Sequence, residues 1–167
     1  MSATLRDSIT DETKAAMKAK DPIRLSTLRL VSAAIKDRDI EARSQDRCGG
    51  IGDPEILSLL SKMVKQREEA AKTYEENGRL ELAEREREEI GTIRDFLPTP
   101  LTEDEVEAAI RAEMDRHGAT CLKDMGKIMG ALKAGYAGRI DMGRAGGTVK
   151  RLLCEAQKNG GSETAAQ

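Results

Sequence analysis

The stretch Lys123-Asp124-Met125-Gly126-Lys127-Ile128-Met129-Gly130-Ala131-Leu132-Lys133 predicts a helix with two different faces. In a helix that turns about 100° per residue, apolar side chains gather on one side. They are Met125, Ile128, Met129 and Leu132. The residues of the opposite side are Lys123, Gly126, Lys127 and Gly130. The apolar side predicts burial in a small core. The other side has no side chain between two ammonium groups, so a backbone or a phosphate could approach it closely.

The two glycines also have a purely structural interpretation. Gly126 and Gly130 are separated by three residues, a spacing that lets a neighbouring helix pack closely against the glycine side. The spacing alone does not distinguish a packing surface from a binding surface. Both interpretations therefore stay open at this point.

This stretch carries a resemblance to a known family. The sequence DMGKIMGALK, a short turn, the sequence GRID and a basic amphipathic segment at 149–153 are similar to the C-terminal signature of the GatB/YqeY family. The likeness runs from the N-terminal helices through Phe96-Leu97-Pro98 to about Leu153. It departs from the family pattern at Ile140, at Met142 and at the pair Gly146-Gly147. Two glycines inside a helix lower its stability, so the last helix is expected to be weak.

The family consists of free-standing proteins that resemble the tail region of the B subunit of the glutamine-dependent aspartyl/glutamyl-tRNA amidotransferase. The resemblance implies tRNA or another structured RNA as a partner, with a tRNA-processing or aminoacylation protein as a further candidate. It also implies the label of a carbon-nitrogen ligase that uses glutamine as amide donor. The residues do not support catalysis, because neither a phosphate-binding G-x-x-x-x-G-K-S/T motif nor a Ser-Lys or Cys-His nucleophile arrangement is present.

Composition favours an all-α fold. Aromatic residues make up 2% of the chain and charged residues 35%, which is typical of long amphipathic helices. Cys48, Cys121 and Cys154 are widely spaced and His117 is the single histidine, so neither a disulfide framework nor a metal site is expected. No cofactor is expected. Since no apolar run suggests a signal peptide or a membrane span, we expect a cytoplasmic protein.

Positive charge is concentrated near the end of the chain. Residues 119–154 contain seven Lys and Arg against two Asp and Glu, whereas residues 1–118 contain 20 against 26. This asymmetry is an argument about partners. The predicted polyanion-binding residues are Lys123, Gly126, Lys127, Gly130, Lys133, Arg139, Arg144 and Lys150.

Helix start and stop signals predict two subdomains and a tail. Residues 1–97 are expected to form a four-helix subdomain with a long helical hairpin, and residues 102–156 a three-helix subdomain. Residues 157–167 are expected to form a disordered tail. The boundary lies at Pro98-Thr99-Pro100-Leu101, because proline breaks the helical pattern. No internal repeat is expected.

Individual signals place the helix ends. Asp-Pro pairs at Asp21 and Asp53 start the second and third helices, and Asn77-Gly78 ends the third. Glycines make residues 45–52 a flexible loop. Thr102 and Glu105 form a capping box. The remaining caps are Thr120 for the signature helix and Asp141 for a last helix to about Glu155.

The charged run Glu84–Glu89 of the fourth helix predicts a solvated face, without the water exclusion that acid/base chemistry requires. Two functions therefore remain open besides the ligase label. The chain is either a non-catalytic module that binds RNA through phosphates or a module whose hairpin binds another protein.

Overall fold

A computed structural model describes residues 4–162, with side chains to residue 159. These residues form seven α-helices and one 3-10 helix and contain no strand, so the all-α fold is confirmed. Contacts divide the chain into two compact units, Met1–Pro98 and Thr99–Gln167. The division falls beside the predicted proline boundary.

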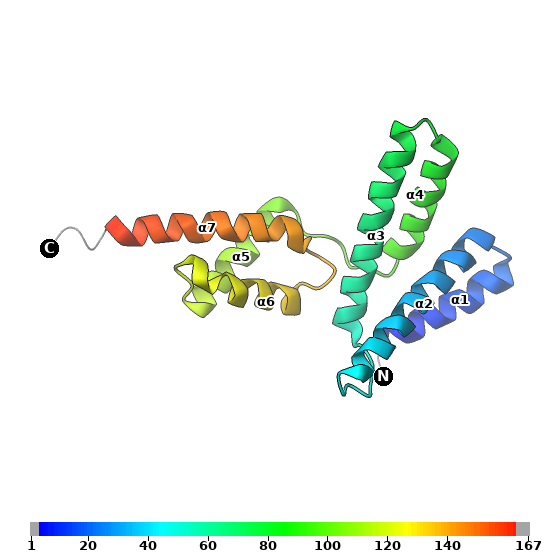
Figure 1. Cartoon of the computed structure of the whole chain (residues 1–167), viewed down its shortest axis with the longest axis horizontal. Coiled ribbons are helices and arrows are strands. Elements are labelled where there is room, and N and C mark those ends of the chain that lie inside the picture. The colour runs from blue at the N-terminus through cyan, green and yellow to red at the C-terminus, as the bar shows by residue number, and fades with distance from the viewer. Residues whose placement is uncertain (1–3, 163–167) are drawn as a thin grey trace. The chain divides into compact units, whose positions relative to one another are not determined.

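The first unit contains two pairs of helices (Figure 1). They are α1 (Leu5–Ala19), α2 (Pro22–Ser44), α3 (Asp53–Glu76) and α4 (Leu80–Arg94). Helices α3 and α4 form an antiparallel hairpin, and α2 packs against α1, α3 and α4. The core is made mainly of aliphatic side chains at helical spacing, among them Ile9, Val31, Ile35, Ile56, Leu60, Ile90 and Ile93.

Local signals placed most helix ends of this unit correctly. The carboxylate of Asp21 accepts the N–H of Arg24 at 3.0 Å and caps α2 as expected. Helix α3 ends at Glu76, and Gly78 adopts the left-handed conformation with φ 71°. The start of α3 differs by one residue, because Gly52 is the N-cap and donates its N–H to Glu55 at 3.1 Å.

The glycine-rich loop at residues 45–52 is tied to α2. Arg6 donates two hydrogen bonds to Asp39, at 2.8 and 3.1 Å, and the N–H of Ile51 donates to the same carboxylate at 2.9 Å. Gly50, with φ 75°, passes so close that a Cβ there would clash with Asp39 Oδ1. The loop predicted to be flexible therefore has a specific anchor.

The solvated face predicted for Glu84–Glu89 is wrong at one residue. Glu89 is buried, and Arg67 of α3 donates to its carboxylate at 3.0 Å. Arg67 and Glu89 are 15% and 12% exposed at their side chains, so the pair lies inside the hairpin. Both residues occupy positions of the apolar stripes, since Arg67 lies between Val64 and Ala71 and Glu89 precedes Ile93 by one turn.

The second unit contains α5 (Glu103–His117), the 3-10 helix η1 (Leu122–Asp124), α6 (Met125–Gly135) and α7 (Met142–Ser162). Its core includes Ala109, Ile110, Ile128, Leu132, Ile140, Val149, Leu152 and Leu153. The capping box is confirmed, because Thr102 donates its N–H to Glu105 at 2.8 Å and accepts the N–H of Glu105 at 3.3 Å. Asp141 caps α7 as expected, accepting the N–H of Gly143 at 2.8 Å.

The last helix is longer than the sequence indicated. Helix α7 continues past Glu155 to Ser162, so residues 157–162 of the expected disordered tail are helical, and residues 163–167 lie outside the described part. The Gly146-Gly147 pair does not interrupt α7. A Cβ at Gly146 would lie 3.9 Å from the methyl carbons of both Met125 and Met129, so Gly146 packs against α6.

Candidate nucleic-acid interface

The signature stretch begins with a tight turn. Residues 122–124 form the 3-10 helix η1, and α6 starts only at Met125, so Lys123 precedes the helix on which it was placed. Thr120 was expected to cap this helix, but the N-cap residue of α6 is Asp124, whose side chain makes no capping hydrogen bond to α6. Its carboxylate accepts the N–H groups of Thr120 and Cys121, at 3.3 and 3.4 Å. The first of these hydrogen bonds contributes most to lowering the pKa of Asp124.

Helix α6 is oriented as its two faces predicted. Ile128 and Leu132 are completely buried, whereas Gly126 and Gly130 are exposed. A Cβ at either glycine would have no described atom outside its own helix within 4 Å. No described helix uses these glycines for close packing, so the structural interpretation of the pair is wrong within the described chain.

Helices α6 and α7 form a seam where Met129 meets Gly146. Lys133 and Lys150 each follow a seam residue by four positions, so each lies about 40° around its helix from the contact. Both helices turn their apolar sides to the core that they share with α5, so the remaining sides face solvent together. We call this solvent side the outer face. Its residues are Gly126, Gly130, Lys133, Gly143, Gly147 and Lys150, all exposed.

The predicted cations differ in how free they are. Within the described residues, four of them make no ion pair: Lys123, Lys133, Arg144 and Lys150. Lys127 lies 3.7 Å from Asp124. Arg139 lies apart from the outer face, because its guanidinium donates to the carbonyl of Thr99 at 3.2 Å. It secures the start of the second unit.

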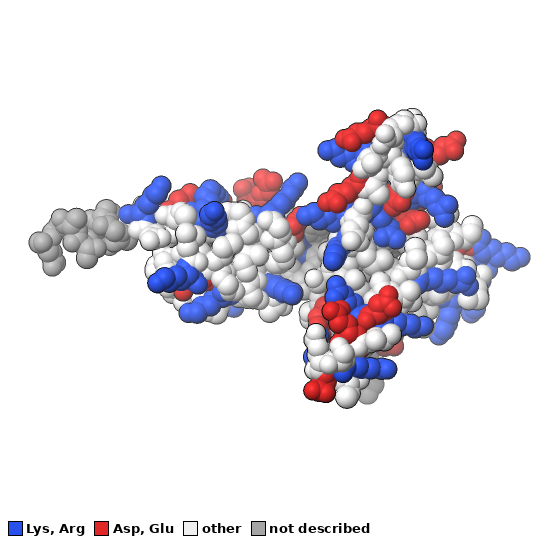
Figure 2. Space-filling model, in the orientation of Figure 1, with Lys and Arg blue, Asp and Glu red and all other residues white. Residues whose placement is uncertain are grey.

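Arg151 shows why position matters more than charge. It follows Lys150 directly, but its guanidinium donates to Glu107 of α5 at 2.6 Å and to Glu155 at 3.1 Å. Lys150 is left free. Figure 2 shows Lys and Arg side chains along the α6 and α7 edges of this unit, with some Asp and Glu side chains among them and uncharged atoms between the edges. The outer face is therefore a surface of exposed glycines flanked by Lys133 and Lys150.

The described part of the chain contains no group of three or more His, Cys, Asp and Glu side chains that could hold a metal ion.

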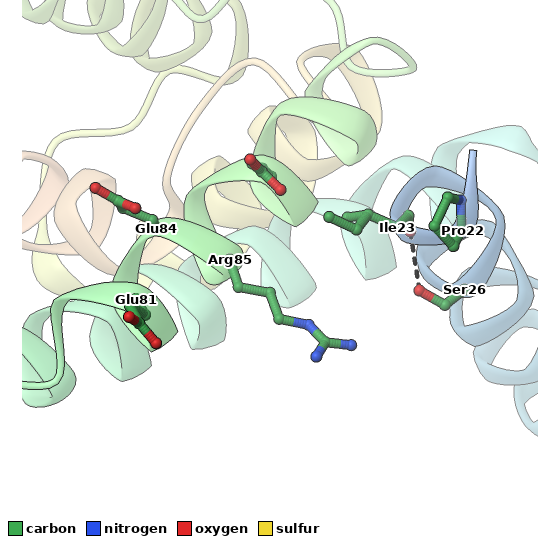
Figure 3. A pocket seen from close by; sticks show the side chains of 7 residues that line it. Pro22, Ile23, Ser26, Glu81, Glu84 and Arg85 are labelled. Atoms are coloured by element: carbon green, nitrogen blue, oxygen red, sulfur yellow. Dashed lines mark hydrogen bonds between the residues drawn. The ribbon is translucent and has the colours of Figure 1, made fainter.

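A hollow of about 530 Å³ lies between α2 and α4 in the first unit. It is lined by Pro22, Ile23, Ser26, Glu81, Glu84, Arg85 and Glu88. Figure 3 shows Arg85 extending from α4 toward α2. Its carboxylates are exposed, so the hollow does not exclude water as acid/base catalysis requires.

One buried carboxylate was missed by sequence reasoning. Glu113 of α5 is 4% exposed, and its Oε2 accepts no hydrogen bond from the described residues. Arg116 and His117 of the same helix lie 3.1 and 3.5 Å from its two oxygens. The sequence did contain a signal for this burial. Glu113 follows Ala109 by four positions and Ile110 by three, which places it on the apolar side of α5.

No described helix is long and apolar enough to cross a membrane.

Comparison with known proteins identifies the family of this chain. The chain matches the family described as "Yqey-like protein" over residues 6–153, from α1 to the middle of α7. It belongs to the YqeY-like family. The match includes both units and the whole outer face. It confirms the resemblance drawn from the signature stretch.

Similar proteins include "Altered inheritance of mitochondria protein 41, mitochondrial" of two yeasts. The protein of Lachancea thermotolerans is 30% identical over 67% of this chain and 54% of its own length. That of Clavispora lusitaniae is 31% identical over 60% and 56%. An uncharacterized protein of Schizosaccharomyces pombe is 30% identical over 59% and 72%. The YqeY-like chain thus spans about half the length of the first two relatives.

These relatives correct one expectation. We expected a cytoplasmic location because the sequence showed no targeting segment, and this expectation is wrong, since the two yeast relatives are named as mitochondrial proteins. Neither the family description nor the names of the relatives state a reaction or a nucleic-acid ligand.

Proposed function

We propose that this YqeY-like protein is a non-catalytic accessory module that binds tRNA or another structured RNA through its phosphates. The observation that carries the proposal is the set of exposed cations without ion pairs in the second unit, Lys123, Lys133, Arg144 and Lys150. A cation without a protein partner can pair with a phosphate without first breaking an ion pair. The phosphate then releases the counterion that was bound to the nucleic acid. The open glycines of α6 add room for a phosphate backbone.

The test compares two double variants in binding to total tRNA across a salt series. Lys123→Ala/Lys133→Ala removes two free cations of the second unit. Lys36→Ala/Lys62→Ala removes two exposed lysines of α2 and α3, which also make no ion pair in the described residues. If both lysines contact phosphates, the first variant lowers the salt slope by about two units, and the control leaves it unchanged.

Equal binding by the parent and Lys123→Ala/Lys133→Ala at every salt concentration would contradict the proposal. Circular dichroism of both variants gives the folding control. Exposed lysine substitutions are expected to change the free energy of unfolding by no more than about 0.5 kcal/mol.

The alternative function, a hairpin that binds another protein, has one supporting observation. Leu80 and Leu82, at the start of α4 beside the hairpin turn, are 62% and 40% exposed. Leu80→Glu/Leu82→Glu separates the two proposals. Unchanged tRNA binding together with loss of a co-purifying protein partner would favour the protein-binding function.

A further inference from the structure

Helices α6 and α7 carry two copies of one ten-residue motif. The first copy is DMGKIMGALK at 124–133, and the second is DMGRAGGTVK at 141–150. Five of the ten positions are identical, and the fourth is Lys in one copy and Arg in the other. The expectation that the chain has no internal repeat is therefore wrong.

The two copies also fold alike. Each helix begins at the Met of its copy, Met125 in α6 and Met142 in α7. From that Met to the final Lys, all nine equivalent positions share the same class of burial. The equivalents Leu132 and Val149 are both completely buried. Sequence, helix start and burial thus agree position by position.

The copies meet at equivalent residues. Figure 1 shows α6 and α7 running in opposite directions. Gly146 is the sixth residue of the second copy, and it lies against the methyl carbons of Met129, the sixth residue of the first copy, and of Met125, the second. Antiparallel helices whose copies lie together at their sixth residues have the arrangement of an isologous interface, in which a twofold axis relates the two sides.

A twofold arrangement of the two copies pairs the residues of the outer face. The pairs are Gly126 with Gly143, Gly130 with Gly147, and Lys133 with Lys150. A second cation lies about 160° from the seam on each helix, Lys127 on α6 and Arg144 on α7. The outer face therefore presents the same glycine and lysine arrangement twice, in opposite directions.

A ligand that matches such a face has two equivalent, oppositely directed edges. The two strands of a nucleic-acid duplex are antiparallel, and twofold symmetry in a protein is matched by twofold symmetry in the duplex that it binds. We infer that the outer face binds a base-paired segment of RNA, with one copy of the motif on the phosphates of each strand. This inference rests on the proposed function and specifies its ligand.

The chemistry of the face favours paired over unpaired RNA. Proteins that hold unpaired bases stack them on aromatic rings. The chain has one Phe and two Tyr, and none belongs to the outer face, since the nearest in sequence, Tyr136, packs against the core of the second unit. A face with exposed glycines, where no side chain hinders close approach, suits the wide, shallow minor groove of an RNA helix.

The experiment measures binding to an RNA hairpin with a stem of about 16 base pairs, to an unstructured RNA of the same length, and to a DNA hairpin of the same sequence. The variants are Lys133→Ala, Lys150→Ala and the double variant, with Lys36→Ala/Lys62→Ala as control. For the RNA hairpin, each single variant is expected to lower the salt slope by about one unit and the double variant by about two. The unstructured RNA and the DNA hairpin bind more weakly.

The outcomes separate the inference from the function on which it rests. If Lys133→Ala weakens binding and Lys150→Ala does not, or if the unstructured RNA or the DNA hairpin binds as tightly as the RNA hairpin, the twofold duplex inference is overturned while RNA binding stands. If neither variant changes binding to any of these nucleic acids, the inference for the outer face is overturned, and Lys123→Ala/Lys133→Ala tests the proposed function separately.

Discussion

The hairpin α3–α4 and the pair α6–α7 are both antiparallel helix pairs, and they use their charges in opposite ways. In the hairpin, arginines pair with glutamates of the facing helix, as in Arg67–Glu89, Arg94–Glu68 and Arg87–Glu75. In α6–α7, Lys133 and Lys150 have no ion pair within the described residues. These arginines of the hairpin are therefore engaged within the fold, whereas Lys133 and Lys150 of the second pair are not.

The same contrast holds for glycine. Gly91 of α4 and Gly126 of α6 are both exposed helix residues with open space where a Cβ would be. Only Gly126 belongs to the outer face, together with Lys133 and Lys150. Matched substitutions in the two helix pairs can therefore separate an effect on folding from an effect on binding.

The largest expected effect is on the two cores. Leu60 and Leu132 are completely buried, one in each unit. Leu60→Ala and Leu132→Ala should each lower the free energy of unfolding by about 2 to 5 kcal/mol. Urea denaturation measures it, with exposed Leu80→Ala as a control expected to change it by less than about 0.5 kcal/mol. If each substitution destabilised both units equally, the units would not be separate folding domains.

The next effect concerns the ion pair inside the hairpin. Arg67→Ala leaves Glu89 buried without its main partner, so the free energy of unfolding should fall by about 1 to 3 kcal/mol. Lys72→Ala is the control, because Lys72 and Glu76 are exposed and 3.9 Å apart, and such pairs contribute up to about 0.5 kcal/mol. Equal losses in urea denaturation would show that burial does not distinguish these pairs. RNA binding should be unaffected in both.

A smaller effect is expected at the glycines. Alanine is favoured over glycine inside a helix by up to about 1 kcal/mol, and neither Gly91 nor Gly126 has a neighbour that a methyl group would displace. Gly91→Ala and Gly126→Ala should both raise the thermal midpoint. Only Gly126→Ala should weaken RNA binding, as measured by fluorescence anisotropy. Loss of stability in Gly126→Ala would instead indicate that this glycine is needed for the fold.

The smallest effect is a pH dependence in the first unit. The hydrogen bond from Arg6 lowers the pKa of Asp39, with the N–H of Ile51 adding to it. A carboxyl whose folded pKa is lowered stabilises the protein fully above its unfolded pKa, about 3.9, and this contribution is lost as the pH falls through the folded pKa. Urea denaturation between about pH 6 and pH 3 should show a fall in stability that is reduced in Asp39→Asn. An identical pH dependence in both proteins would contradict this assignment.

Local sequence was sufficient for most helix ends of this protein. Asp21 before Pro22, the box of Thr102 and Glu105, and Asp141 before Met142 each act within one turn, so their hydrogen bonds depend on residues a few positions apart. The same holds for the two faces of α6. The exceptions were the start of α3, where the N-cap is Gly52 and not Asp53, and the start of α6, where the N-cap is Asp124 and not Thr120.

Contacts between distant segments were outside the reach of such reasoning. Asp39 anchors the loop through Arg6, 33 residues away in sequence, and Glu89 is buried because Arg67 faces it across the hairpin. In each case the helical periodicity of the sequence predicted something else: either an apolar side chain at that position or a charged side chain in solvent. Only the position of its partner decides that burial is tolerated.

For the candidate site, the sequence by itself determined which residues are basic, which side of α6 is apolar and that glycines lie between the lysines. The tertiary structure alone decided that the glycines are open, that Arg139 and Arg151 are engaged, and that Lys133 and Lys150 lie on one face. The physical reason is that residue spacing defines directions around a single helix, whereas neighbouring helices determine which direction is solvent. The repeated motif was present in the sequence from the start, but equal burial in two antiparallel helices was needed to give it meaning.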